Sequence, residues 1–253
     1  MSSPGVTKHL MTDLDGTLVN FREISAQADF VMKTLRILRR ELGADVSWVS
    51  TLRGLRAVKN ELKRPAEYSP WPTLTNAERS AQVFSDSLGI PVDKSREVLE
   101  HAMFSVFPKL RKHFYPVPGA NEFIQWVRAH LPITLATNPV WPVELVKYRV
   151  EWGGVDSTAF STITHAGIMH SCKPSKHYYL ESLKLSGADL KPSQFLHIGN
   201  ELINDLAATR VGIPVFIVVR DTKFRKIQSA KGELAPAWTG SFSDLRSFLE
   251  ERI

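Results

Sequence analysis

The chain has 253 residues, of which 43% are hydrophobic and 23% are charged, a balance typical of a globular protein that buries its own core. No apolar run approaches the roughly 18–20 residues of a membrane span, and the first ten residues lack an apolar signal-peptide core. We therefore expect a cytoplasmic protein without a membrane partner. A single cysteine, Cys172, excludes an internal disulfide and a cysteine-based zinc site.

Basic residues outnumber acidic ones, 32 Lys and Arg against 26 Asp and Glu, which gives a net charge of +6 and a pI near 9.4. This excess suits an anionic partner, such as nucleic acid, an acidic membrane surface or a phosphorylated small molecule. The sequence contains no helix-turn-helix, RNP or zinc-finger pattern, so no specific nucleic acid is predicted. We interpret the basic residues as solvated helix faces, with a bias toward an anionic substrate.

The first predicted element is a short buried strand over residues 8–13, followed by the stretch DLDGTLVN. Asp13 and Asp15 lie two residues apart, and extended chain directs such side chains to the same side. Two carboxylates held close together resist ionisation unless a cation or strong donors lie between them. Asp and Gly are also ordinary turn residues, so these residues alone fit a solvated turn equally well.

A helical pattern then replaces the strand pattern. Residues 28–42 carry Phe30, Leu38 and Leu42 at helical spacing, and further helical stretches cover 77–90 and 95–114. The segment 115–123, with two prolines and a glycine, is typical of a linker that returns to the core. The sequence therefore predicts a discontinuous core, residues 1–20 and 116–253, interrupted by a helical cap, residues 21–115.

Strands and helices alternate after the insert. Apolar segments over 133–138, 194–200 and 215–221 are predicted strands, and helical patterns cover 119–131, 177–187 and 203–213. This alternation is typical of a doubly wound parallel sheet. The predicted fold class is α/β, with a Rossmann-like parallel sheet, helices on both of its faces and an inserted all-helical cap.

Polar residues follow these strands, at the sheet edge where open parallel sheets bind ligands. Thr137 and Asn138 follow the second strand and suit a phosphoryl oxygen, whereas Lys173 precedes a predicted helix. The third strand ends in an oxygen cluster suited to a hard cation, made of Asn200, Glu201 and Asp205.

Each of these residues also has an ordinary structural interpretation, as a turn former, a surface lysine or a first-turn helix acid. Their coincidence at one edge, in chain order, favours a functional site. Mg²⁺ prefers a few protein oxygens together with waters and substrate phosphate, and this set can supply them.

Together the four segments resemble the four motifs of the haloacid dehalogenase-like (HAD) superfamily, over residues 8–20 and about 116–220. DLDGTLV is similar to the first motif, D-x-D-G-T; Thr137 matches the Ser or Thr of the second, and Lys173 the Lys of the third. GNELINDLAATRVGIP resembles the acidic fourth motif, although Asn200 stands where the family often has Asp. The chain is also similar to a poorly characterised group of bacterial HAD-type hydrolases, and its helical insert resembles their C1 cap.

The resemblance implies a Mg²⁺-dependent phosphatase of a small phosphorylated metabolite. Asp13 would form an aspartyl-phosphate, Asp15 would act as general acid and base, and Lys173 would neutralise phosphoryl charge. Thr137 and the amide of Asn138 would hold the phosphoryl oxygens. The implied Mg²⁺ ligands are Asp13, the carbonyl of Asp15 and Asn200, with Glu201 and Asp205 binding directly or through water. Dehalogenases of this architecture lack the second Asp, so Asp15 favours phosphate ester hydrolysis.

Two alternatives stay open. A non-catalytic HAD-like protein that binds a phosphorylated ligand or partner is supported by Asn200 and opposed by the complete set of the other motif residues. A phosphotransferase, such as a mutase, would share the first chemical step. In the insert, Arg53 and Arg56 could reach an acidic part of a substrate, but surface charge on a helix is the simpler interpretation.

Overall fold

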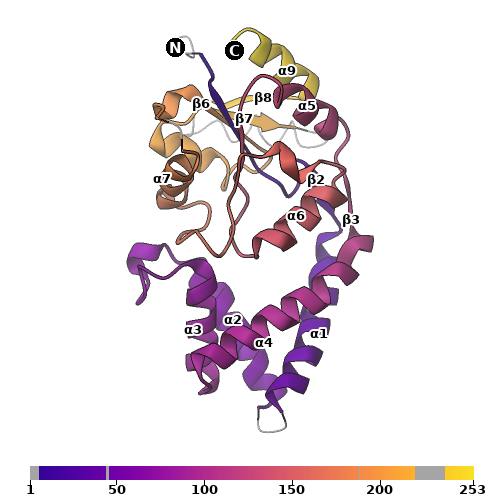
Figure 1. The fold of residues 1–253 in the computed structure, drawn as a ribbon, viewed down its shortest axis with the longest axis vertical. Coiled ribbons are helices and arrows are strands. Elements are labelled where there is room, and N and C mark those ends of the chain that lie inside the picture. Colours follow the sequence, from indigo (N-terminus) through magenta and orange to yellow (C-terminus); the bar gives the residue numbers. More distant parts are fainter. Residues whose placement is uncertain (1–5, 44–45, 188, 220–236) are drawn as a thin grey trace.

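The computed structural model describes residues 6–43, 46–187, 189–219 and 237–253. Within these residues one six-stranded parallel sheet has the order β5-β4-β1-β6-β7-β8 (Figure 1). The last two residues of the strand predicted over 215–221 lie outside the described residues. The strands are β1 (His9–Thr12), β4 (Ile133–Leu135), β5 (Thr162–Ile163), β6 (Phe195–Gly199), β7 (Val215–Val218) and β8 (Ala237–Gly240).

Strand β1 lies at the centre of the sheet, between β4 and β6. Leu10 is in register with Ile133 on one side and with Leu196 on the other. All residues of β1, β4, β6 and β7 are buried, as expected for parallel strands covered on both faces. The carboxyl ends of β1, β4 and β6 therefore meet at one edge of the sheet.

Helices cover both faces of this sheet, as predicted. Leu10 and Phe216 belong to one apolar cluster, whereas the next residues, Met11 and Ile217, belong to another, because strand side chains alternate between faces. The first cluster includes residues of α5 (Ala120–Val127), α6 (Val143–Trp152) and α9 (Phe242–Glu250). The second includes residues of α7 (Lys176–Leu185) and the short 3₁₀ helix η5 (Leu206–Val211). The α/β fold class is thus confirmed.

Four helices lie together at the opposite end of the molecule from the sheet (Figure 1). They are α1 (Glu23–Leu42), α2 (Trp48–Leu62), α3 (Asn76–Leu88) and α4 (Val92–Val106), within the span 21–115 where the sequence predicts a cap. A small apolar cluster of Leu38, Phe84, Val98 and Ala102 joins α1, α3 and α4, and the partly buried Leu55 and Val58 of α2 pack against it. They are joined to the core through an antiparallel pair of strands, β2 (Val19–Phe21) and β3 (Phe114–Pro116), which we call the hinge ribbon.

Two predicted helices are shorter than the sequence analysis expected. The segment 95–114 is not one helix, since α4 ends at Val106 and a 3₁₀ helix, η2 (Phe107–His113), follows. Pro108 explains the change, because proline lacks the amide hydrogen that continues an α-helix. The helix predicted over 203–213 is only the 3₁₀ turn η5, which ends at Gly212 in the left-handed conformation.

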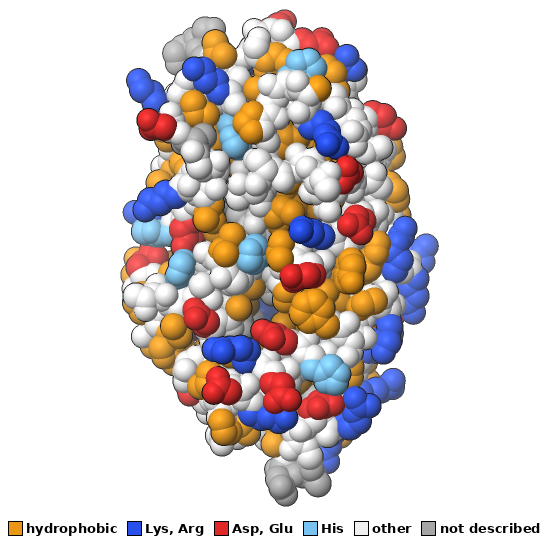
Figure 2. Space-filling view, in the orientation of Figure 1, with side chains coloured by type: hydrophobic (Ala, Val, Ile, Leu, Met, Phe, Trp, Pro, Cys, Tyr) orange, Lys and Arg blue, Asp and Glu red, His pale blue; other side chains and the backbone are white. Residues whose placement is uncertain are grey.

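The basic segments of the insert and its return lie on the surface. Arg36, Arg40, Lys109, Arg111 and Lys112 are all exposed. Figure 2 shows Lys and Arg side chains along one edge of the molecule, and acidic side chains among them over much of the same face. In the described part of the chain, no helix has the length and apolar character needed to cross a membrane.

The cap helix α3 contacts the core through its first turn. The Asn76 side chain donates to the carbonyl of Pro139 at 3.1 Å, just after the second motif. Arg79 is fully buried and donates to the carbonyl of His170 at 2.8 Å and to the Glu61 carboxylate at 2.8 Å. These bonds hold α3 against the loop that leads to Lys173.

Replacement of Arg79 by Met is expected to remove the buried cation of Glu61 and leave this carboxylate only the exposed Arg64, whose Nε lies 3.6 Å from Glu61 Oε2. We expect the free energy of unfolding to fall by about 3–5 kcal/mol, the usual cost of breaking a buried ion pair on one side. Urea denaturation followed by circular dichroism measures the loss. Arg96→Met, at an exposed ion pair with Asp93, is the matched control and should change stability by less than about 0.5 kcal/mol. Equal effects of the two variants would contradict a buried anchoring role for Arg79.

Candidate active site

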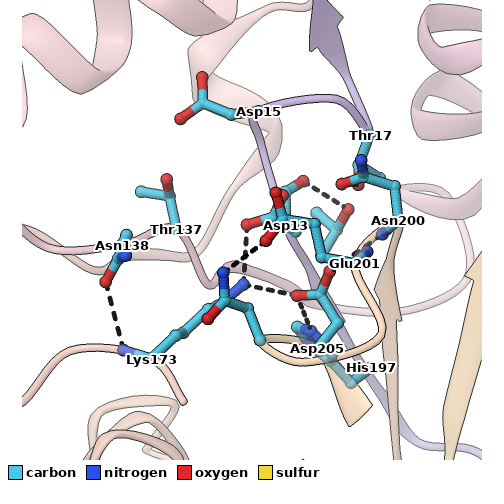
Figure 3. Close-up of polar contacts among 12 residues, drawn as sticks. Asp13, Asp15, Thr17, Thr137, Asn138, Lys173, His197, Asn200, Glu201 and Asp205 are labelled. Atoms are coloured by element: carbon cyan, nitrogen blue, oxygen red, sulfur yellow. Dashed lines mark hydrogen bonds and ion pairs between the residues drawn. The ribbon is translucent and has the colours of Figure 1, made fainter. Parts of the chain in front are cut away.

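A buried lysine joins two carboxylates at the edge where β1 and β6 end (Figure 3). The Lys173 ammonium lies 2.7 Å from Asp13 Oδ1 and 2.8 Å from Asp205 Oδ1. Asp13 directly follows β1, and its amide donates to the Ile198 carbonyl of β6, which fixes its backbone. The Lys173 side chain is 2% exposed, so this cation is held by the two carboxylates and not by water.

The Asp205 carboxylate accepts hydrogen bonds from four donors. Its Oδ1 accepts from Lys173 and from His197 Nε2 at 3.0 Å, and its Oδ2 accepts from the amides of Asn200 and Glu201, each at 2.9 Å. Burial opposes ionisation of this carboxyl, but the Lys173 charge and the His197 hydrogen bond together hold its pKa well below the ordinary value. Asp205 thus shapes the turn after β6 and orients Lys173.

The turn after β6 requires glycine at position 199. A β-carbon there would lie 2.1 Å from the Asp205 carboxyl carbon, far inside contact distance. Only a residue without a side chain lets the Asp205 carboxylate approach the strand end this closely. The glycine of the fourth motif is therefore required by its packing against Asp205.

Asp13 differs from Asp205 in its protonation. Burial raises the pKa of the Asp13 carboxyl to about 7, even though the Lys173 charge lowers it; the nearby carboxylates of Asp205 and Asp15 add to the rise. Its Oδ1 faces Lys173, and among the described residues no hydrogen bond to Oδ2 is found. Ligand binding that brings positive charge beside Asp13 would favour its ionised form.

The first and fourth motifs are joined by one side-chain contact. Thr17 Oγ1 donates to Asn200 Oδ1 at 3.1 Å. Gly16 lies between them with φ of 84°, and a β-carbon there would lie 2.4 Å from Asn200 Nδ2. The turn after Asp15 therefore fits closely against Asn200, and the amide oxygen of Asn200 is aligned by Thr17.

The predicted phosphoryl-binding residues lie at the end of β4. Thr137 is buried, and its Oγ1 has no hydrogen-bond partner among the described residues. Its carbonyl accepts from Tyr178 Oη at 2.9 Å and from Thr164 Oγ1 at 2.7 Å, which fix the backbone there. Asn138 Oδ1 accepts from the Lys173 amide at 3.2 Å. The Thr137 hydroxyl is thus a buried group without a hydrogen-bond partner among the described residues, next to Asn138, which lines a cavity of this site.

A cavity of about 360 Å³ opens over this set. Its walls include Asp13, Asp15, Asn20, Asn138, Lys173, Asn200, Glu201 and Asp205. Phe21 and Glu23, from the start of the insert, also line it. The structure thus brings together all predicted site residues except Thr137 as walls of one cavity. Arg53 and Arg56 are exposed on α2 and do not line it.

The donor set fits a hard cation with few protein ligands. Among the described residues, no three His, Cys, Asp or Glu side chains form a metal-binding group. Asp13 and Asn200 nevertheless present oxygens at the cavity, and the carbonyl of Asp15 is a further candidate, a set that suits Mg²⁺ with waters and phosphate. A direct ligand role for Asp205 would require one of its present donors to leave. Glu201 is exposed and lines the cavity mouth.

Sequence reasoning missed two residues of this site, His197 and Arg149. His197 was visible only as part of a predicted strand, and its contact with Asp205 depends on how the turn after β6 folds back. Arg149, on α6, forms an ion pair with Asp15 across 134 residues of sequence. No local pattern marks either residue, because both contacts are set by tertiary packing.

No protein-family model matches this chain, and no curated protein matches it significantly. Solved structures do match over nearly its whole length. The 2-haloacid dehalogenase from Pseudomonas syringae pv. Tomato DC3000 is 17% identical, with a TM-score of 0.62 over 97% of this chain and 99% of that one.

Two further similar structures carry bound ions. The putative HAD-hydrolase YfnB from Bacillus subtilis, bound to magnesium, is 16% identical, with a TM-score of 0.53 over 96% of this chain and 99% of that one. A HAD family hydrolase from Deinococcus radiodurans R1, with bound phosphate and sodium, is 17% identical, with a TM-score of 0.54 over 99% and 97%. This chain therefore has the fold of the HAD hydrolases, as its motifs predicted.

The raised pKa of Asp13 predicts a pH dependence of stability. The folded chain holds the Asp13 proton up to about pH 7, whereas the unfolded chain releases it near the ordinary value of 3.8. Between these values the contribution of Asp13 to the unfolding free energy falls as the pH rises. Asp13→Asn removes that slope, so we expect this variant to gain stability relative to wild type from pH 4 to pH 7, with no further gain above.

Urea denaturation in EDTA at several pH values measures this difference. Asp93→Asn, at an exposed carboxylate of the cap, is the control, and its difference from wild type should stay flat. A stability difference between Asp13→Asn and wild type that is the same at pH 5 and pH 8 would contradict the raised pKa.

Proposed function

We propose that this chain is a Mg²⁺-dependent phosphatase that hydrolyses the phosphate ester of a small metabolite through an aspartyl-phosphate. The observation that carries the proposal is the Asp13 carboxylate held 2.7 Å from the buried Lys173 ammonium, with a second aspartate two residues on. A carboxylate can approach a phosphoryl group only where positive charge offsets their repulsion. Lys173 supplies such a charge beside the attacking oxygen.

In the first step, Asp13 attacks phosphorus, a bond forms between them, and the bond from phosphorus to the ester oxygen breaks. Asp15 gives its proton to that leaving oxygen, so the alcohol departs neutral. In the second step, water attacks phosphorus and passes a proton to Asp15. The bond from Asp13 to phosphorus then breaks, which returns both carboxyl groups to their starting states.

The other site residues would bind the phosphoryl oxygens, position Lys173 or hold the metal ion. Thr137 Oγ1, buried and without a partner among the described residues, would donate to a phosphoryl oxygen, together with the amide of Asn138. Asp205 and His197 keep Lys173 in place. Asp13, Asn200 and the Asp15 carbonyl would hold Mg²⁺, which when bound offsets phosphoryl charge as a Lewis acid.

The similar structures support this proposal in part. The D. radiodurans protein binds phosphate and the B. subtilis protein binds magnesium, whereas the P. syringae protein is a dehalogenase. Asp15 favours the phosphatase, since breaking a carbon–halogen bond needs no proton on the leaving group. We place the enzyme in the cytoplasm, where phosphorylated metabolites are plentiful.

Phosphate release tests the proposal. Wild type is incubated with sugar phosphates, nucleotides, phospho-acids and p-nitrophenyl phosphate, in Mg²⁺ or in EDTA. We expect turnover that depends on Mg²⁺ and falls by at least about a thousandfold in Asp13→Asn, because the nucleophile is lost. Asp93→Asn, far from the cavity, should keep full activity.

Other outcomes would select other functions. Chloride release from 2-chloropropionate without phosphate release would indicate a dehalogenase. Binding of phosphorylated ligands without turnover on any substrate would indicate a non-catalytic protein. Transfer of phosphate to a second metabolite in place of water would indicate a phosphotransferase.

A further inference from the structure

The Asp15 carboxylate does not face the Asp13–Lys173 pair. Figure 3 shows it directed away from the group formed by Asp13, Lys173 and Asp205. Instead, Asp15 Oδ2 accepts from Arg149 Nη1 of α6. Asp15, which transfers protons in the proposed mechanism, is therefore held by Arg149 at a position away from Asp13 and Lys173.

The Arg149 side chain is buried and poorly satisfied. It is 6% exposed, and its Nε and Nη2 have no acceptor among the described residues. Asp15 is also the only carboxylate found in an ion pair with it in the described part of the chain. If Asp15 left, the guanidinium would be a buried and unpaired charge, which is strongly unfavourable. The pair thus favours the withdrawn position of Asp15.

The helix that carries Arg149 is firmly packed and cannot easily follow Asp15. Trp152, one turn on, stacks on Phe107 with ring centroids 5.3 Å apart and lies 5.0 Å from the ring of Phe114 in the hinge ribbon. A β-carbon at Gly153 would lie 3.0 Å from the Val19 Cβ of the same ribbon. Movement of Asp15 toward the phosphoryl site must therefore break its contact with Arg149.

We propose that Arg149 is a positioning residue, which holds the Asp15 side chain withdrawn from the Asp13–Lys173 pair and must release it before proton transfer. This inference rests on the proposed function for its kinetic consequence. The inferred position of the Asp15 side chain does not depend on the proposed function. Loss of Arg149 removes stabilisation of the withdrawn state, so the engaged state becomes easier to reach.

A comparison of two phosphate esters distinguishes the release of Asp15 from a general loss of activity. p-Nitrophenolate leaves without protonation, whereas the alkoxide of an alkyl phosphate such as glycerol phosphate needs the Asp15 proton. In Arg149→Met we expect kcat for the alkyl ester to rise relative to that for p-nitrophenyl phosphate, by about threefold to tenfold. In the Asp15→Asn background the same substitution should leave this ratio unchanged. Arg128→Met, at an exposed arginine paired with Asp156, is the control and should not alter the ratio.

Crystal structures of wild type and Arg149→Met without substrate give the second readout. We expect Asp15 at Arg149 in the wild type and turned toward Asp13 and Lys173 in the variant. An unchanged or lowered ester ratio, or a change that persists with Asn at position 15, would overturn the proposal. So would a wild-type crystal structure with Asp15 already at the phosphoryl site, a test that holds even if the variant does not fold. Absence of turnover by wild type on both esters would count against the phosphatase and leave the structural readout to decide the role of Arg149.

Discussion

The buried ammonium of Lys173, shared between Asp13 and Asp205, is the contact on which the site depends. A lysine that is 2% exposed needs anionic partners, and two aspartates from the ends of β1 and β6 provide them at 2.7 and 2.8 Å. The two carboxyl groups respond in opposite ways. Asp205 also accepts from His197 and two amides, so it stays ionised, whereas Asp13 has fewer donors and its pKa is raised to about 7. One carboxylate is thus fixed in place while the other is left open to a ligand.

The fold brings these groups together through sheet order. Because β1 lies between β4 and β6, Asp13 is flanked by Thr137 and Asn138 on one side and by Asn200 on the other. The cap is tied to the same edge. Arg79 of α3 bonds the carbonyl of His170, three residues before Lys173, and the hinge ribbon packs on α6, which carries Arg149. One connection of the cap therefore ends at the loop that leads to Lys173, and the other at the helix that carries Arg149.

Much of this arrangement could be predicted from the sequence. Apolar strand segments followed by Asp13, Thr137 and Asn200 mark the sheet edge, because parallel strands present their carboxyl ends together. The helical insert can be predicted from the spacing of its apolar residues. Pro108 indicates the end of α4, but the helical spacing on both sides of it predicts one longer helix. Strands β5 and β8 are too short or too weakly patterned to predict. Arg149 and His197 could not be found, since their partners depend on packing between elements far apart in sequence.

Trapping of the covalent intermediate tests the central claim most directly. The protein is quenched during turnover of p-nitrophenyl phosphate with Mg²⁺, reduced with borohydride, which converts an aspartyl-phosphate to homoserine, and digested for peptide mass spectrometry. The account predicts homoserine at position 13 in wild type and its absence when substrate is omitted. Turnover accompanied by an unmodified Asp13, or by modification at another carboxylate, would contradict the assignment of Asp13 as nucleophile.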